Sequence, residues 1–157
     1  MAISNITTNY TGRTIDLHIF QGVNAPNASD ITPSFGLISN YCSGVQKLVQ
    51  RYAILLLTEL GSQELYPDFG SDLLTKLTST SNNYNRSDLF TLFALANVKV
   101  SDVILAYQIE NPLPLDEQLD VATLEEIVTT TDGGVALRVN ISTRAVGAID
   151  FLLPLPS

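Results

Sequence analysis

The chain has 157 residues, of which 45% are hydrophobic and 15% are charged, and its formal net charge is −8. This length predicts a single domain, 1–157, large enough to bury a core without covalent crosslinks. The acidic charge argues against a nucleic-acid-binding surface, and a single cysteine, Cys42, excludes a disulfide within the chain. The start of the sequence lacks the pattern of a signal peptide, and no apolar run of about 18 residues predicts a membrane span, so we expect the protein to be made and folded in a cytosol.

The first 42 residues predict an arm, a strand and a long link. Residues 1–13 are polar and rich in Asn and Thr, which is typical of an extended N-terminal arm that becomes ordered against another surface. Apolar and polar residues alternate over 15–20, the pattern of a half-buried strand. The link 21–41 is long for a compact domain, and such links often carry function. Within it we expect 34–38 to be extended.

The helical part of the chain, 43–110, opens with a predicted helix–turn–helix corner. Ser43 and Gln46 fit a capping box, in which each side chain satisfies one unpaired backbone N–H at the start of the helix. The apolar residues that follow recur at helical spacing. Gly61 is placed to end this first helix.

A fixed turn follows, formed by Pro67, Asp68, Phe69 and Gly70. Proline restricts one backbone φ angle, and glycine can adopt a positive one. Ser71 and the acid after it then begin a second, short helix. The corner is therefore expected to be rigid, and nothing in it is arranged like a catalytic centre.

The longest predicted helix begins at Ser87 and Asp88 and ends before the prolines that follow Asn111. Its apolar positions predict a wide stripe that faces the core. This inward stripe comprises Leu89, Phe90, Phe93, Ala94, Val100, Val103, Ile104 and Tyr107.

The C-terminal part, 111–157, predicts three strands. Alternation is interrupted near 122–124, which indicates a bulge, and the glycines in 132–134 predict a tight hairpin. The fold class is therefore α+β, with about three helices packed on one face of a small, mostly antiparallel sheet. The strands are expected at 119–130, 135–142 and 148–153.

Candidate catalytic and metal-binding groups are few. The only histidine, His18, would form a nucleophilic pair with Cys42 if the fold brought them together, because a cysteine beside a helix start can have a lowered thiol pKa. The alternative is that Cys42 is a small half-buried residue. One histidine and one cysteine do not make a zinc site. The sequence therefore predicts no catalytic residue, no metal and no cofactor.

Two basic residues on the polar face of the first predicted helix indicate an acidic counterpart. Lys47 and Arg51 stand one helical turn apart, where like charges cost a helix about 0.2–0.5 kcal/mol. The counterpart is either a carboxylate of a neighbouring subunit or this chain's own acids and solvent.

The same corner carries a resemblance to a known family. A helix ending in LLTELGS, followed by YPDFGS and a leucine pair, resembles the baseplate wedge proteins of contractile phage tails. That family is also labelled lysozyme-like and has a counterpart in type VI secretion baseplates. The similarity is most specific over 44–74 and extends more weakly to 15–24 and to the closing strands.

The resemblance implies a non-enzymatic structural subunit of the virion, located in the tail baseplate and made in the host cytoplasm. Such a subunit joins other wedge proteins to the tube and sheath base, so its partners are proteins. The acidic net charge and the lack of a predicted span argue against nucleic-acid and membrane partners, and we expect no small-molecule substrate.

The family usually carries a Glu-Pro-Arg motif just before the strand that follows the long helix. The matching place here reads Asp116, Glu117 and Gln118, so an acid is retained while the proline and the arginine are absent. Together with Lys47 and Arg51, these residues are the candidate partner-binding positions. The departure from the motif implies a partner surface that differs from that of the family.

Two alternative functions remain open. A peptidoglycan hydrolase needs two carboxyl groups, about 5–5.5 Å apart for retention or about 6.5–9.5 Å for inversion, and Glu59 with Glu64 or Asp68 are the candidates. Glu59 is expected near a helix C-terminus, where an unpaired acid is disfavoured, so a structural partner for Glu59 is the competing interpretation. The other alternative is an adaptor or a secretion-system baseplate component.

Overall fold

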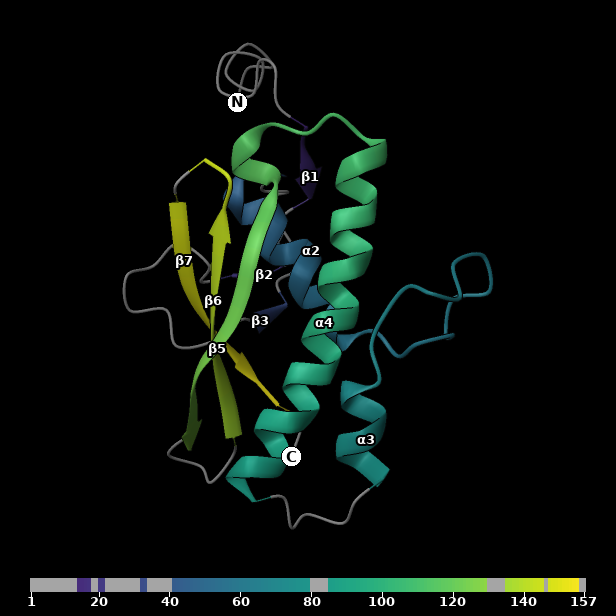
Figure 1. The fold of residues 1–157 in the computed structure, drawn as a ribbon, viewed down its shortest axis with the longest axis vertical. Helices are drawn as coiled ribbons and strands as arrows, with labels where there is room; N and C mark the ends of the chain where they lie inside the picture. The colour runs from purple at the N-terminus through teal and green to yellow at the C-terminus, as the bar shows by residue number, and fades with distance from the viewer. Residues whose placement is uncertain are drawn as a thin grey trace.

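The computed structural model describes residues 14–17, 20–21, 32–33, 41–79, 85–129, 135–145 and 147–155. Within these ranges, three α-helices pack on one face of a three-stranded antiparallel sheet, which confirms the expected α+β class (Figure 1). Three predicted segments lie outside the described residues. They are the arm at 1–13, the extended segment at 34–38 and the hairpin at 132–134.

Helix α2 (Val45–Leu57) begins without the expected capping box. Its N-cap residue is Gly44, which has a φ of 64°, and no side chain caps the helix. The Gly44 N–H instead donates a hydrogen bond to the carboxylate of Glu117, 3.2 Å away. The predicted roles of Ser43 and Gln46 are therefore wrong, because the cap falls one residue later, at a glycine whose positive φ a serine would adopt only with strain.

The same helix ends at Leu57, before the predicted stop at Gly61. Thr58 is already extended, and its hydroxyl donates to the Ile54 carbonyl oxygen at 2.7 Å. The Thr58 carbonyl oxygen accepts a hydrogen bond from the Ser71 N–H at 2.8 Å. The chain leaves the helix early because Ser71 satisfies backbone carbonyl oxygens that lack a partner at the end of α2, those of Leu56 and Thr58.

Helix α3 (Leu73–Ser79) begins where the sequence predicts. The Ser71 hydroxyl oxygen accepts a hydrogen bond from the Leu73 N–H at 3.2 Å and donates to the Leu56 carbonyl oxygen at 2.7 Å. Ser71 is buried, so this one hydroxyl joins the end of α2 to the start of α3.

Helix α4 (Arg86–Glu110) is capped by Asn85, whose side chain accepts a hydrogen bond from the Asp88 N–H at 2.9 Å. Ser87 and Asp88 therefore lie inside the first turn, and the expectation that they cap the helix is wrong. Asparagine is as good an N-cap as serine or aspartate, which is why the earlier position prevails. The helix ends before the prolines, as expected.

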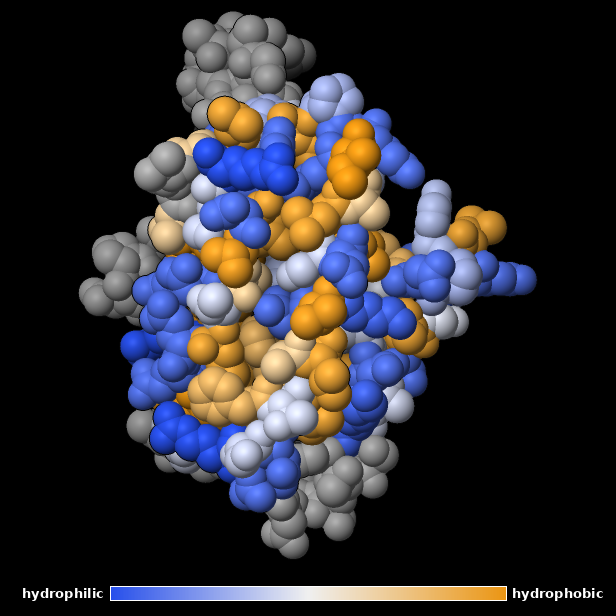
Figure 2. All heavy atoms as spheres, in the orientation of Figure 1, coloured by the Kyte–Doolittle hydropathy of each residue, from blue (hydrophilic) through white to orange (hydrophobic). Residues whose placement is uncertain are grey.

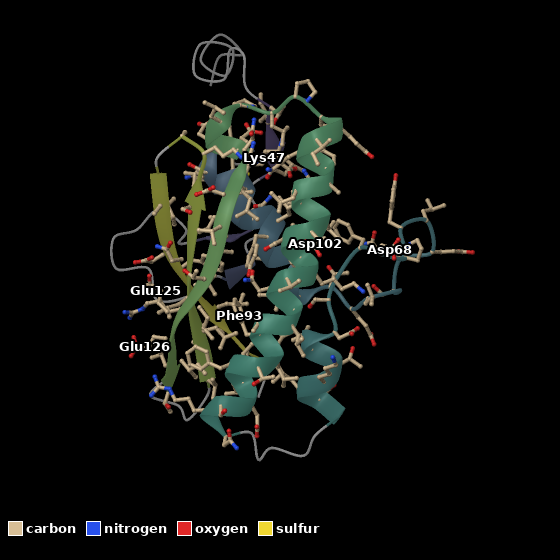
Figure 3. All side chains as sticks on the ribbon, viewed as in Figure 1. Lys47, Asp68, Phe93, Asp102, Glu125 and Glu126 are labelled. Atoms are coloured by element: carbon tan, nitrogen blue, oxygen red, sulfur yellow. The ribbon has the colours of Figure 1, made fainter. Side chains whose placement is uncertain are left out.

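The buried face of α4 is narrower than the predicted stripe. Phe90 is 40% exposed and Tyr107 is 36% exposed, and Ala94 is also exposed, so their inward placement is wrong. Phe93 lies between α4 and the sheet (Figure 3). The residues that are buried follow one line of three- and four-residue steps, and this line includes Ala96, which the prediction left out. The buried residues of α4 are Leu89, Phe93, Ala96, Val100 and Ile104.

The C-terminal sheet has the order β5-β6-β7 and is antiparallel throughout. The register places Val139 of the central strand between Leu124 and Phe151. Two register shifts in the first strand flank the irregularity expected near 122–124. The strands are β5 (Leu119–Thr129), β6 (Val135–Thr143) and β7 (Gly147–Pro154).

Two short antiparallel strand pairs lie in the N-terminal part of the chain. Ile15 is 42% exposed and Leu17 is 55% exposed, so the half-buried strand expected over 15–20 is wrong at these positions. The pairs are β1 (Asp16–Leu17) with β4 (Tyr41–Cys42), and β2 (Phe20–Gln21) with β3 (Thr32–Pro33).

The hydrophobic core lies where α2 is enclosed by α4 and the sheet. Tyr52 of α2 packs edge-to-face on Phe151 of β7, with ring centroids 6.2 Å apart. Its hydroxyl donates to Asn97 Oδ1 of α4 at 2.6 Å, and Asn97 donates to the Ala122 carbonyl oxygen of β5 at 2.8 Å. Burial raises the pKa of Tyr52 far above its ordinary value, so the phenol keeps the proton that links these elements.

Candidate functional site

The carboxylate of Glu117 is the centre of a buried polar network. Glu117 ends the short 3-10 helix η1 (Leu115–Glu117) and is 3% exposed. The Lys47 ammonium lies 3.6 Å from Glu117 Oε2, and the Gly44 N–H donates to Oε1. The Thr14 hydroxyl donates to the same carboxylate and accepts a hydrogen bond from Lys47. A buried charge needs such partners, and here they join the start of α2 to the segment before β5.

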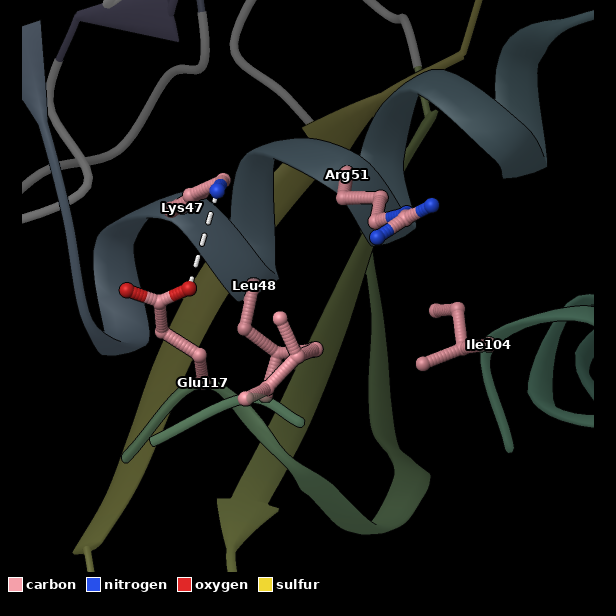
Figure 4. A pocket seen from close by; sticks show the side chains of 6 residues that line it. Lys47, Leu48, Arg51, Ile104 and Glu117 are labelled. Carbon is pink, nitrogen blue, oxygen red and sulfur yellow. Dashed lines mark ion pairs between the residues drawn. The ribbon is translucent and has the colours of Figure 1, made fainter. Parts of the chain in front are cut away.

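Arg51 takes no part in this network. Its guanidinium carbon lies 3.5 Å from the centroid of the Tyr107 ring on α4, a cation–π contact. Figure 4 shows the guanidinium pointing away from the Glu117 carboxylate while Lys47 pairs with it. The sequence left two sources open for the partners of Lys47 and Arg51: a neighbouring subunit, or this chain and solvent. In the structure, both residues have partners within the chain itself.

The residues at the place of the family motif also make contacts within the fold. The Gln118 side-chain amide donates to the Leu113 carbonyl oxygen at 2.7 Å, and its side-chain oxygen accepts from the Arg144 guanidinium at 3.4 Å. Asp116 is half-buried and is also engaged. The five predicted partner-binding residues thus gather near one end of α2, where four of them have identified contacts within the fold.

A small hollow lies beside this network. Its lining includes Lys47, Arg51 and Glu117, and its volume is about 10 Å³, room for about one water molecule (Figure 4). A substrate does not fit there. No cluster of metal-ligating side chains occurs within the described ranges.

Cys42 lacks the properties of a nucleophile. It is fully buried, and this burial, followed by the negative charge of Asp16, raises the pKa of its thiol to about 11. Lys47 acts in the opposite direction but does not compensate. The lowered thiol pKa expected beside a helix start is therefore wrong, and the thiol is protonated at neutral pH. His18, its proposed partner, lies outside the described residues.

The carboxylates considered for glycoside hydrolysis lie in or beside an exposed loop. Glu59 accepts a hydrogen bond from the Thr75 hydroxyl at 3.0 Å, which gives it the structural partner that the competing interpretation requires. Glu64 and Asp68 are exposed, and Asp68 lies on the segment that projects from the helices (Figure 3). All three carboxylates are exposed to solvent.

The backbone of the corner between α2 and α3 is extensively paired. The Gly61 N–H donates to the Pro67 carbonyl oxygen at 3.0 Å, and the Phe69 N–H donates to that of Tyr66 at 3.0 Å. Gly70 has a φ of 119°, and a Cβ atom at this position would lie 2.6 Å from the Thr58 carbonyl oxygen. Only glycine fits there without displacement of backbone, which agrees with the expectation of a fixed turn.

This corner, defined here as residues 58–71, turns apolar side chains toward solvent. Figure 1 shows it projecting from the helices, and Leu65 is 86% exposed and Tyr66 is 66% exposed. Phe69, in contrast, packs against the core. Sequence reasoning missed Leu65 and Tyr66 as candidate contact residues, because no periodicity marks exposure within a loop.

Comparisons of this chain with protein-family models, curated proteins and solved structures found no match.

Proposed function

We propose that this protein is a structural subunit of a contractile-tail baseplate wedge, which joins other wedge proteins to the tube and sheath base. The observation that carries the proposal is the geometry of the corner. The segment with the family-like sequence is closed by backbone hydrogen bonds, requires glycine at Gly70, and holds Leu65 and Tyr66 in solvent. A preorganised apolar projection suits a permanent protein contact, because little conformational entropy is lost on docking.

The chemistry of the described residues favours the same class of function. The buried charges are used within the fold, and the thiol of Cys42 is protonated. The carboxylates of the corner, Glu59, Glu64 and Asp68, are exposed, and Glu59 accepts a hydrogen bond from Thr75. Within the described residues, nothing specifically favours a peptidoglycan hydrolase over a protein that acts by binding.

The experiment that tests this function is cross-linking mass spectrometry on purified tail particles that carry the chain. Lys76 lies at the exposed surface of α3, close in sequence to the corner, and is the best site for the reagent. We expect cross-links from Lys76 to other tail proteins. Absence of the chain from purified particles would refute the proposal, and particles from a secretion system would instead assign the chain to that machine.

The matched variants test whether the corner makes the contact. We expect Leu65→Ser combined with Tyr66→Ser to lower incorporation into particles while the purified variant stays folded. The control is Val121→Ser, which also replaces an exposed apolar residue, 48% exposed, but on β5. Equal incorporation of both variants would exclude the corner as the contact.

A further inference from the structure

The outer face of α4 carries a second apolar pattern. Leu95, Val98, Asp102, Leu105 and Ile109 follow one another in steps of three, four, three and four residues. This is the heptad spacing by which one helix packs along another. We call these five positions the outer seam; it is about 21 Å long, because a helix rises about 1.5 Å per residue.

Four of the five positions of the outer seam are exposed, and Leu105 is half-buried. Leu95 is 58% exposed, Val98 is 61% exposed and Ile109 is 86% exposed. Figure 2 shows apolar side chains gathered over the side of α4 that faces the viewer, and Figure 3 places Asp102 on that side. A soluble monomer rarely leaves a contiguous row of large aliphatic side chains in water, so the row indicates a binding face.

The buried face of α4 is already occupied by α2, α3 and β5. The whole helix is therefore apolar on two sides, and it has the length and composition that would allow a helix to cross a membrane, contrary to the expectation from the sequence. Only 28% of its most apolar stretch is buried in the fold. Because Phe93 and Val100 pack within the core, α4 cannot turn all of its surface to lipid while this fold persists.

Asp102 argues against two possible partners of the outer seam, a second copy of the chain and a membrane surface. It is the middle position of the outer seam, and its side chain forms no ion pair with any described residue. A second copy of α4, aligned along the seam in either direction, would bring two Asp102 carboxylates together, which disfavours self-pairing. A membrane surface would have to take in the same carboxylate, and the net charge of −8 opposes binding to anionic lipid.

We propose that the outer seam docks one α-helix of a different protein, with apolar residues at heptad spacing and a Lys or Arg opposite Asp102. Charge complementarity at one core position sets the register and excludes self-pairing. The inference does not depend on the proposed function, because it uses only the exposed face of α4.

The test uses the full chain and a synthetic helical probe of about three heptads, with leucine at the core positions and one central lysine. A matched probe carries glutamate in place of the lysine. Because Asp102 is central in the outer seam, the central residue faces it in either chain direction. We expect the lysine probe to bind at least about tenfold more tightly than the glutamate probe in fluorescence anisotropy.

Three variants of the chain complete the design. Asp102→Lys is expected to reverse the preference between the two probes, and Val98→Glu is expected to abolish binding. Glu125→Lys makes the same change of charge on β5 and is expected to leave binding unchanged. Circular dichroism of each variant checks that the fold is retained.

Each other outcome overturns the proposal. Failure of the lysine probe to bind, equal affinity for both probes, or binding that survives Val98→Glu would exclude the outer seam as a selective helix site. Self-association of the chain that Val98→Glu abolishes would identify a second copy as the occupant. Co-sedimentation with phosphatidylcholine vesicles that Val98→Glu abolishes would identify a membrane surface.

Discussion

The two ends of α2 differ in what they bury: a charged pair is buried near the N-terminal end, whereas apolar side chains are exposed beyond the C-terminal end. At the N-terminal end, Lys47 and Glu117 pair inside the fold, and Glu117 is 3% exposed. At the C-terminal end, the corner pairs its backbone internally and leaves Leu65 and Tyr66 in solvent. The charged residues that stand out in the sequence therefore stabilise the fold, whereas the exposed contact candidates are apolar residues on a loop whose shape the backbone fixes.

Removal of the Glu117 carboxylate should have the largest effect on stability. We expect Glu117→Ala to destabilise the protein by about 3–5 kcal/mol, because it leaves the Lys47 ammonium and the Gly44 N–H without their carboxylate. Urea denaturation, followed by circular dichroism, measures the change. The control is Glu125→Ala, which removes an exposed acid and should change the free energy of unfolding by less than about 0.5 kcal/mol. Equal effects of the two variants would contradict the contrast between the ends of α2.

A pair of glycine variants examines the corner itself. We expect Gly70→Ala to cost about 3 kcal/mol, because the new Cβ atom meets the Thr58 carbonyl oxygen and the φ of 119° is unsuited to alanine. Gly61→Ala is the matched control: its φ is 76°, but nothing lies within 4 Å of the added atom, so the cost is only about 1 kcal/mol. Thermal denaturation ranks the two. If Gly61→Ala proved the more harmful, the corner would not be held at the contact between Gly70 and Thr58.

The buried thiol of Cys42 makes the stability of the fold depend on pH at alkaline values. Its thiol pKa is raised from 9.0 to about 11 in the folded protein, so the folded state holds the proton more tightly than the unfolded state. The stability that this provides is fully present below pH 9 and is lost as the pH rises to about 11.

Denaturation of the wild type and of Cys42→Ala across this range measures that contribution. We expect the wild type to lose more stability than the variant between pH 9 and about 11. Tyr52 titrates in the same direction in both proteins, so its contribution cancels in the comparison. Parallel pH profiles would show that the Cys42 thiol is not shielded, and rapid alkylation by iodoacetamide at pH 8 would agree with that result.

The sequence correctly predicted the parts of the fold that depend only on residues close together in the chain. The proline after Asn111 ends α4, the Ser71 hydroxyl starts α3, and the glycine at position 70 permits the turn. The failed prediction at the start of α2 has its cause far away in the chain. The capping box at Ser43 fails because the N–H of the next residue is satisfied by Glu117, 73 residues later.

The same limit applies to the candidate site. Charge and spacing correctly indicated that Lys47 needs an acid, and Glu117 was among the residues selected, but pairing between them depends on how η1 folds back on α2. The heptad spacing of the outer seam is visible in the sequence. Because α4 is apolar on both faces, periodicity alone does not indicate which face packs against the core. Exposure is a property of tertiary packing, and it was the missing information in both cases.

The smallest effect on stability is expected for Leu65 and Tyr66, the exposed residues proposed to contact a partner. Leu65→Ser combined with Tyr66→Ser should change the free energy of unfolding by only about 0.5 kcal/mol, because both side chains are mostly in water in the folded state. Phe69→Ser, three residues further along, removes a side chain that packs against the core and should cost several times more. Urea denaturation of the two variants separates these roles. A large loss from the Leu65 and Tyr66 substitutions would mean that the tip of the corner stabilises the fold, and that apolar exposure there is not reserved for a partner.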